Sequence, residues 1–169
     1  MSDNIRVGLI GYGYASKTFH APLIAGMPGM TLAAVSSSDA AKVHADWPSV
    51  PVVSEPKHLF NDPNIDLIVI PTPNDTHFPL AKAALEAGKH VVVDKPFTVT
   101  LSQARELDAL AKSLGRLLSV FHNRRWDSDF LTVKRLLSEG TLGEILFFES
   151  HFDRFRPQVR NRWREQAGP

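Results

Sequence analysis

The feature that most constrains this chain is a glycine-rich stretch near the N-terminus, residues 7–16, which reads VGLIGYGYAS. The apolar residues 5–10 predict a strand, Gly11 permits a tight turn after it, and Gly13 lets the backbone approach a pyrophosphate. A helix beyond the turn would offer its free N–H groups to the phosphates. Ser16 stands where glycine or alanine is usual, so we expect slightly looser helix–strand packing. The pattern predicts a dinucleotide-binding βαβ unit whose contacts come from Gly11, Tyr12, Gly13, Tyr14 and Ala15.

The rest of the first 122 residues alternates short apolar runs with helical segments, which is typical of an α/β fold. The run 65–70 is almost uniformly apolar, as expected of a central parallel strand covered on both faces. The predicted fold class is therefore a Rossmann-type doubly wound parallel sheet. The expected strands are 5–10, 31–36, 50–53, 65–70, 90–93 and 117–121. The expected helices begin near 14 (kinked by Pro22) and cover 39–44, 76–87 and 101–114, with a turn or short helix at 56–61.

The pattern changes after His122, which suggests the start of a second structural unit. Residues 130–138 predict a helix with a half-buried face, and residues 144–152 predict a long strand rich in Phe and Ile. We therefore predict a nucleotide-binding domain over 1–122, and over 123–169 a connecting helix with the first strand of a truncated α/β domain. An apolar strand without partners tends to recruit another chain, so we expect self-association through 144–152, with a two-fold dimer favoured. The alternative is that the tail folds back on the nucleotide-binding domain or stays disordered.

Composition excludes several classes of function. The formal net charge is only +1, which gives no electrostatic argument for binding nucleic acid or a membrane surface. No apolar run approaches the length of a bilayer span, and the polar N-terminus lacks a signal-peptide core, so we expect a cytoplasmic protein. The absence of cysteine excludes disulfides and thiolate chemistry, and the seven histidines lack the spacing of a zinc site. We expect no metal.

Three predicted loops follow parallel strands, at the edge of the sheet where open α/β folds bind ligands. The first is the glycine turn, the second is the segment 71–77, and the third is 94–97. Lys95 follows a buried strand, where a lysine amine beside a nicotinamide could act as an acid or a base. The alternative is a lysine at the end of a strand that simply extends into water.

The motifs Gly11-Tyr12-Gly13, Thr72-Pro73-Asn74 with His77, and Asp94-Lys95-Pro96 together resemble the glucose–fructose oxidoreductase, inositol dehydrogenase and MocA family. The resemblance implies a Rossmann domain followed by an α/β domain with a large open sheet. It also implies hydride transfer between NAD(P) and a sugar, polyol or related carbonyl compound. Asp94 replaces the glutamate of the family pattern. The family's downstream catalytic aspartate and histidine would lie beyond Pro169, so we expect this polypeptide to be inactive alone.

The resemblance also assigns roles to individual residues. Lys95 would be catalytic, hydrogen-bonding the reacting hydroxyl or the nicotinamide side of the site. Thr72, Pro73 and Asn74 would line the ribose and nicotinamide, with His77 closing the loop. Alternatives stay open: Asn74 and Asp75 as a helix cap, and His77 as a structural histidine. The other cofactor-binding candidates are Pro71, Asp94, Pro96 and Asn123, and the Lys95–Pro96 bond is expected to be cis.

Two further positions have alternative interpretations. Asn123, Arg124 and Arg125 leave the sixth strand beside the predicted cleft, where they could face substrate. Trp126 and Asp127 could instead make this segment a packed, salt-bridged corner. His20 could reach the cofactor, although core packing is the simpler interpretation.

The end of the second strand predicts which nucleotide is bound. NAD enzymes usually place an acid there for the ribose 2′-hydroxyl, whereas this chain has Ser36, Ser37 and Ser38, with Asp39 later and Lys42 beyond. Serine hydroxyls and a cation suit a 2′-phosphate, so NADP is favoured over NAD.

Three functions compete at this point. The first is an oxidoreductase acting on a small-molecule sugar or polyol. The second is a non-catalytic dinucleotide-binding module, for redox sensing or assembly. The third is a biosynthetic dehydrogenase of another lineage. The Lys95-Pro96 motif distinguishes the first function from the third. The identity of the substrate is not encoded in these residues.

Overall fold

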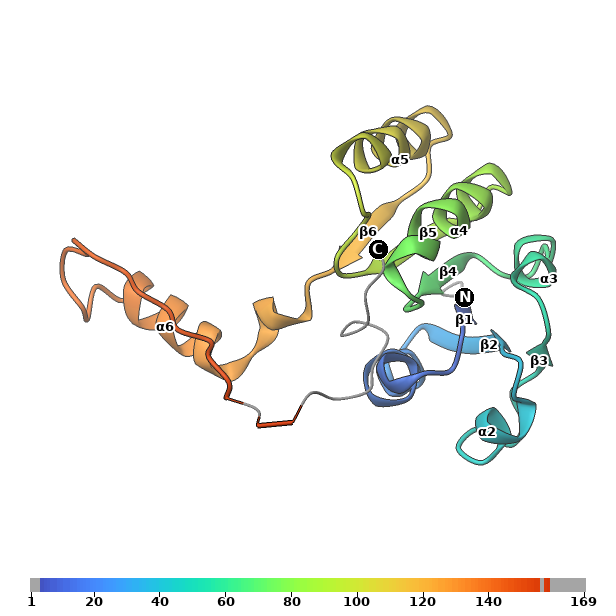
Figure 1. Cartoon of the computed structure of the whole chain (residues 1–169), viewed down its shortest axis with the longest axis horizontal. Helices are drawn as coiled ribbons and strands as arrows, with labels where there is room; N and C mark the ends of the chain where they lie inside the picture. The colour runs from blue at the N-terminus through green and yellow to red at the C-terminus, as the bar shows by residue number, and fades with distance from the viewer. Residues whose placement is uncertain (1–3, 156, 159–169) are drawn as a thin grey trace. The chain divides into compact units, whose positions relative to one another are not determined.

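In a computed structural model, which describes residues 4–155 and 157–158, six parallel strands form one sheet (Figure 1). Their order across the sheet is β3-β2-β1-β4-β5-β6, which confirms the predicted doubly wound fold. The bounds are β1 Ile5–Ile10, β2 Met30–Ser36, β3 Val52–Val53, β4 Leu67–Ile70, β5 His90–Asp94 and β6 Leu118–Phe121. The strand β3 is shorter than expected.

Helices connect these strands at nearly the predicted places. They are η1 Ser16–His20, α1 Ala21–Gly26, α2 Ala40–His44, α3 Pro56–Phe60, α4 Asn74–Glu86 and α5 Leu101–Ser113. After β6 follow η2 Asn123–Trp126 and α6 Ser128–Ser138. The first helix is divided just before Pro22, because the ring of proline fits the first turn of a helix but not its interior. Thr100 and Gln103 form a capping box at the start of α5.

Alternate residues of the strands pack into two apolar clusters, one on each face of the sheet. Ile68 and Ile70 of β4 pack with α3, α4 and α5, whereas Val69 packs with α1 and α2. Figure 1 shows the two groups of helices on opposite sides of the strands. Because a strand turns successive side chains to opposite faces, uniformly apolar runs such as β4 are what a sheet covered on both sides requires.

The chain divides after Phe121 into two units, residues 1–121 and 122–169, one residue from the boundary expected above. In the second unit the expected helix is present as α6, but none of its residues is buried. The expected strand over 144–152 is wrong: residues 145–155 have no regular secondary structure. A strand needs a neighbour for its N–H and C=O groups, and the described residues of this unit contain no other strand. Phe147 and Phe148 are 79% and 72% exposed.

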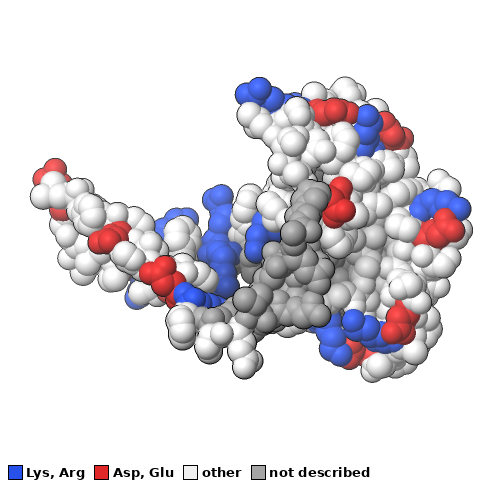
Figure 2. Space-filling view, in the orientation of Figure 1, with Lys and Arg blue, Asp and Glu red and all other residues white. Residues whose placement is uncertain are grey.

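Charges of both signs alternate around the visible rim of the first unit (Figure 2). Within the described residues, no group of three or more His, Asp or Glu side chains is placed to hold a metal ion. No helix in that part of the chain combines the length and the apolar character needed to cross a bilayer.

Lys89, directly before β5, is an unusual buried cation. It is 7% exposed, and its ammonium donates hydrogen bonds to the carbonyls of Asp62 and Ile65, the latter at 2.8 Å. Lys89→Met keeps the apolar length but leaves both carbonyls without this donor. We expect the free energy of unfolding to fall by about 2 kcal/mol in urea titrations. Lys112→Met, at a 75% exposed lysine, should change it by less than about 0.5 kcal/mol. Equal losses in the two variants would contradict the role of Lys89.

Candidate functional site

The candidate site lies at the edge of the sheet formed by the carboxyl ends of the strands. It is at the point where the strand order changes direction, because β2 and β3 lie on one side of β1 and β4 to β6 lie on the other. The strand β1 pairs with β2 on one side and with β4 on the other, so the loops after β1 and β4 open away from each other. Open α/β sheets bind their ligands in the crevice at this switch point. The three loops singled out in the sequence follow β1, β4 and β5, and therefore all lie along this edge.

The glycine turn after β1 has the geometry that close approach of a ligand requires. Gly11 has φ +80°, which side chains other than glycine rarely adopt, and its N–H donates to the Ser36 carbonyl at 2.7 Å. A Cβ added to Gly13 would meet no atom within 4 Å, so the space over this residue is open. Ser16 is fully buried, and its hydroxyl donates to the Gly11 carbonyl at 2.9 Å. The unusual serine is thus accommodated with its polar group paired.

The Tyr12 side chain takes part in a contact that sequence reasoning missed. It is 5% exposed, and its hydroxyl donates to Asp46 at 2.9 Å, while the Lys17 amine lies 2.8 Å from the same carboxylate. Burial and the Asp46 carboxylate raise the pKa of Tyr12, and the hydrogen bonds from Lys17 and Tyr12 lower the pKa of Asp46. Asp46 thereby links the turn and η1 to the segment after α2. A separation of 34 residues hides this link from local patterns.

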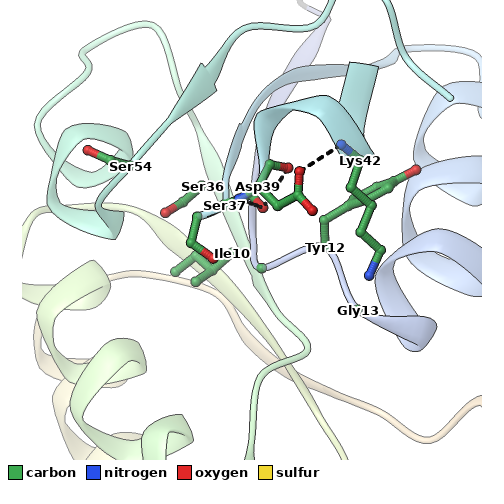
Figure 3. A pocket seen from close by; sticks show the side chains of 10 residues that line it. Ile10, Tyr12, Gly13, Ser36, Ser37, Asp39, Lys42 and Ser54 are labelled. Carbon is green, nitrogen blue, oxygen red and sulfur yellow. Dashed lines mark hydrogen bonds between the residues drawn. The ribbon is translucent and has the colours of Figure 1, made fainter. Parts of the chain in front are cut away.

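A cavity of about 430 Å³ adjoins the glycine turn (Figure 3). Its lining comes from the ends of three strands and from α2: Ile10, Gly11, Tyr12, Gly13, Ser36, Ser37, Ser38, Asp39, Lys42 and Ser54. All the residues predicted from the sequence for nucleotide choice are among them, and Ser54 is an addition. The loop after β3 positions Ser54, and no motif marks it.

The carboxylate that lines this cavity, that of Asp39, already has a hydrogen-bonding role within the protein. The Asp39 carboxylate caps α2 by accepting the Lys42 N–H at 3.0 Å, as the sequence predicted. The Ser37 hydroxyl accepts the Asp39 N–H at 3.1 Å. The Lys42 side chain extends from α2 toward the turn at Tyr12 and Gly13 (Figure 3). The cavity is therefore lined by serine hydroxyls and the Lys42 ammonium, and the Asp39 carboxylate beside them is hydrogen-bonded to the N-terminus of α2.

The loop after β4 leads directly into α4, which begins at Asn74 and so two residues earlier than predicted. The residue before the helix is Pro73, and no side chain caps this end, so the interpretation of Asn74 and Asp75 as a cap is wrong. The Thr76 hydroxyl instead donates to the Pro73 carbonyl at 2.6 Å. The Asn74 Oδ1 atom is buried without a hydrogen-bond partner among the described residues.

His77 connects the loop after β4 to the loop after β5. It is 1% exposed, with Nε2 2.8 Å from the Thr72 carbonyl and Nδ1 2.9 Å from the Pro96 carbonyl. The structural interpretation of this histidine is therefore the one that its contacts support. It holds in place two loops that carry predicted site residues.

Lys95 is exposed at the end of β5, and its N–H donates to its neighbour Asp94 at 2.8 Å. The Lys95–Pro96 peptide bond is cis, which confirms the prediction. Asn123 begins η2 in the second unit. There Arg124 pairs with Asp127 at 2.6 Å, but Trp126 is 76% exposed, so the predicted corner is salt-bridged without being packed.

The residues at this edge fit a dinucleotide: an open glycine turn, a hydroxyl-lined cavity with an ammonium, and an unpaired amide oxygen at Asn74. Together with the 3-2-1-4-5-6 strand order, they define a protein with a dinucleotide-binding Rossmann domain. Comparison with protein families matches residues 5–122 to the GFO_IDH_MocA family, described as "Oxidoreductase family, NAD-binding Rossmann fold". The chain belongs to this family, as its motifs predicted.

Individual relatives support the same assignment. The chain is 88% identical over 169 residues to an uncharacterized oxidoreductase, YdgJ of Escherichia coli K12, and 42% identical over 166 residues to scyllo-inositol 2-dehydrogenase (NADP(+)) IolW of Bacillus subtilis. These matches cover 100% and 98% of the chain but 49% and 46% of the relatives. The chain therefore spans about half the length of the curated relatives it matches.

A solved structure agrees with this fold. The YPO2259 protein of Yersinia pestis, assigned as an oxidoreductase, is 76% identical with a TM-score of 0.93, over 97% of this chain and 47% of that one.

Proposed function

We propose that this chain is the cofactor-binding part of an enzyme that transfers hydride between NADP(H) and a sugar, polyol or related carbonyl compound. The observation that carries the proposal is the convergence of the glycine turn, the Thr72–His77 loop and Lys95 on one edge of the sheet. A non-catalytic nucleotide module would need the first two features but has no use for an exposed lysine amine at the same edge of the sheet.

In this proposal the backbone of the turn holds the nucleotide. The N–H groups from Gly11 to Ala15 receive the pyrophosphate, because Gly13 leaves room for it to come close to the main chain. The Pro71–Asn74 segment lines the nicotinamide ribose, and the unpaired Asn74 Oδ1 accepts a hydrogen bond from the nucleotide. The chemistry that the nicotinamide supplies when bound is hydride transfer.

Lys95 has the catalytic role. Its ammonium donates a hydrogen bond to the oxygen of the substrate carbonyl and, on reduction, passes a proton to that oxygen. In the opposite direction the amine accepts the proton of the hydroxyl. His77 keeps the loop of Lys95 beside the Thr72 loop, because it contacts the Pro96 and Thr72 carbonyls together.

This function is tested best on a longer protein that contains this sequence. NADPH oxidation would be screened against sugars, polyols and keto-sugars, with Lys95→Met as the test variant and Lys112→Met as the control. We expect Lys95→Met to lose turnover and to keep nucleotide binding. Binding without turnover on any compound would favour the non-catalytic module. The 169-residue chain alone is expected to bind nucleotide without turnover.

The 169-residue chain should bind NADPH more tightly than NADH, because Ser36–Ser38 and Lys42 can contact a 2′-phosphate that NADH lacks. Lys42→Ala removes the Lys42 ammonium from the lining of the cavity and should reduce the preference about tenfold in calorimetric titrations. Lys112→Ala on α5 serves as the control and should change neither affinity. Equal affinity for the two nucleotides in the unchanged protein would reject NADP as the favoured cofactor.

We also propose that the chain forms a two-fold homodimer through residues 144–152, now on the basis of their exposed aromatic side chains rather than of a strand edge. Light scattering should give a larger mass for this chain than for one ending at Gly143, after scaling for length. Monomers in both cases would eliminate this contact.

A further inference from the structure

The end of β5 contains an imidazole–carboxylate contact that the proposed function does not use. His20, the last residue of η1, is 4% exposed, and its Nε2 has no hydrogen-bond partner among the described residues. Its neighbouring charged group is Asp94, with 3.9 Å between Nε2 and Oδ2. This distance suits a charge interaction but exceeds that of a hydrogen bond.

Local structure holds this histidine in place. The segment Ser16–His20 is one wide π-helical turn in which the Ala21 N–H bonds to the Ser16 carbonyl, and such turns often occur at functional sites. The Phe121 ring lies against the imidazole with 4.4 Å between ring centroids. Phe121 is also the register partner of Asp94 across β5 and β6. His20 is therefore fixed above the paired ends of two strands.

Asp94 links His20 to Lys95, because its two carboxylate oxygens contact different residues. While Oδ2 faces His20, Oδ1 accepts the Lys95 N–H at 2.8 Å. Burial raises the pKa of the Asp94 carboxyl, but the close approach of His20 and the hydrogen bond and charge of Lys95 outweigh burial, so this pKa lies below its ordinary value. These two residues are the titratable groups that act on Asp94 within the described chain. The glutamate of the family pattern, one methylene longer, would carry its carboxyl farther from its own backbone.

We propose that His20 is a positioning residue for Lys95: it holds the Asp94 carboxylate, which fixes the Lys95 main chain and so the place of the amine. The importance of the position of the Lys95 amine for catalysis rests on the proposed function, whereas the contact between His20 and Asp94 does not depend on it. A core histidine without this role would leave Lys95 unaffected when replaced.

The test uses the nucleotide-free 169-residue chain and NMR of the Lys95 amide, which reports on the Asp94 carboxylate. In the unchanged protein the chemical shift of the Lys95 amide should change with pH as Asp94 ionises, with a midpoint below the ordinary pKa of an aspartate carboxyl. In His20→Leu we expect the midpoint to move upward and the Lys95 amide to exchange about tenfold faster. His20→Gln, which keeps a donor at similar reach, should restore part of both effects. His58→Leu, at an exposed histidine, should change neither.

An unchanged Lys95 amide in folded His20→Leu would overturn the proposal. If that variant does not fold, Asp94→Asn gives the second measurement: the imidazole nitrogen shifts of His20 should change, and those of His44 should not. Unchanged His20 shifts there would also overturn it.

A third measurement separates this proposal from the proposed function. In the longer protein His20→Leu should lower kcat about tenfold with little change in the KM for NADPH. Absence of turnover in the unchanged protein would contradict the proposed function and leave the NMR result standing.

Discussion

Replacing Gly13 with aspartate should weaken NADPH binding at least about a hundredfold while leaving the folded protein as stable as before. An added Cβ at Gly13 meets no atom of the protein within 4 Å, so the fold can accept the side chain. The new carboxylate would stand where the glycine turn approaches the pyrophosphate, and two anions repel each other at close range. Calorimetry with NADPH measures the affinity, and thermal unfolding measures the stability.

Two glycine variants control for this result. Gly13→Ala adds only a methyl group and should weaken binding less than the aspartate does. Gly29→Ala should do the opposite of Gly13→Asp, because Gly29 has φ +83° and lies in the turn before β2, away from the cavity. It should lower the unfolding temperature and keep the NADPH affinity. Equal NADPH binding by Gly13→Asp and the unchanged protein would show that the turn is not the phosphate site.

Replacing His77 with leucine should lower the free energy of unfolding by about 3 kcal/mol, because the buried ring that lies between two loop carbonyls, and donates its N–H to one of them, is lost. The Thr72 and Pro96 carbonyls lie 2.8 and 2.9 Å from its ring nitrogens. For a chain of this size the loss corresponds to a fall of about 6–12 °C in the unfolding temperature. Nucleotide binding should also weaken, since both loops border the proposed nicotinamide end of the site.

His58→Leu is the matched control, because His58 lies exposed on α3. It should change the unfolding temperature by no more than about 2 °C. A similarly small change in His77→Leu would show that the two loops hold their positions without the imidazole.

The sequence by itself determined the sheet and the location of the candidate site. Uniformly apolar runs such as β4, separated by helical segments, can be buried only in a parallel sheet covered on both faces. The glycine turn and the Thr72–Asn74 and Asp94–Pro96 motifs then fall at the ends of β1, β4 and β5 without further information. Periodicity and turn chemistry are local properties, so a single sequence expresses them directly.

The tertiary structure decided which groups meet across long separations. It pairs Tyr12 with Asp46, places Ser54 in the cavity, and brings His20 to Asp94. It also removed two local predictions, the cap at Asn74 and the strand over 144–152. A strand or a cap exists only when a partner satisfies its polar groups, and the position of that partner depends on the packing of the whole unit rather than on neighbouring residues.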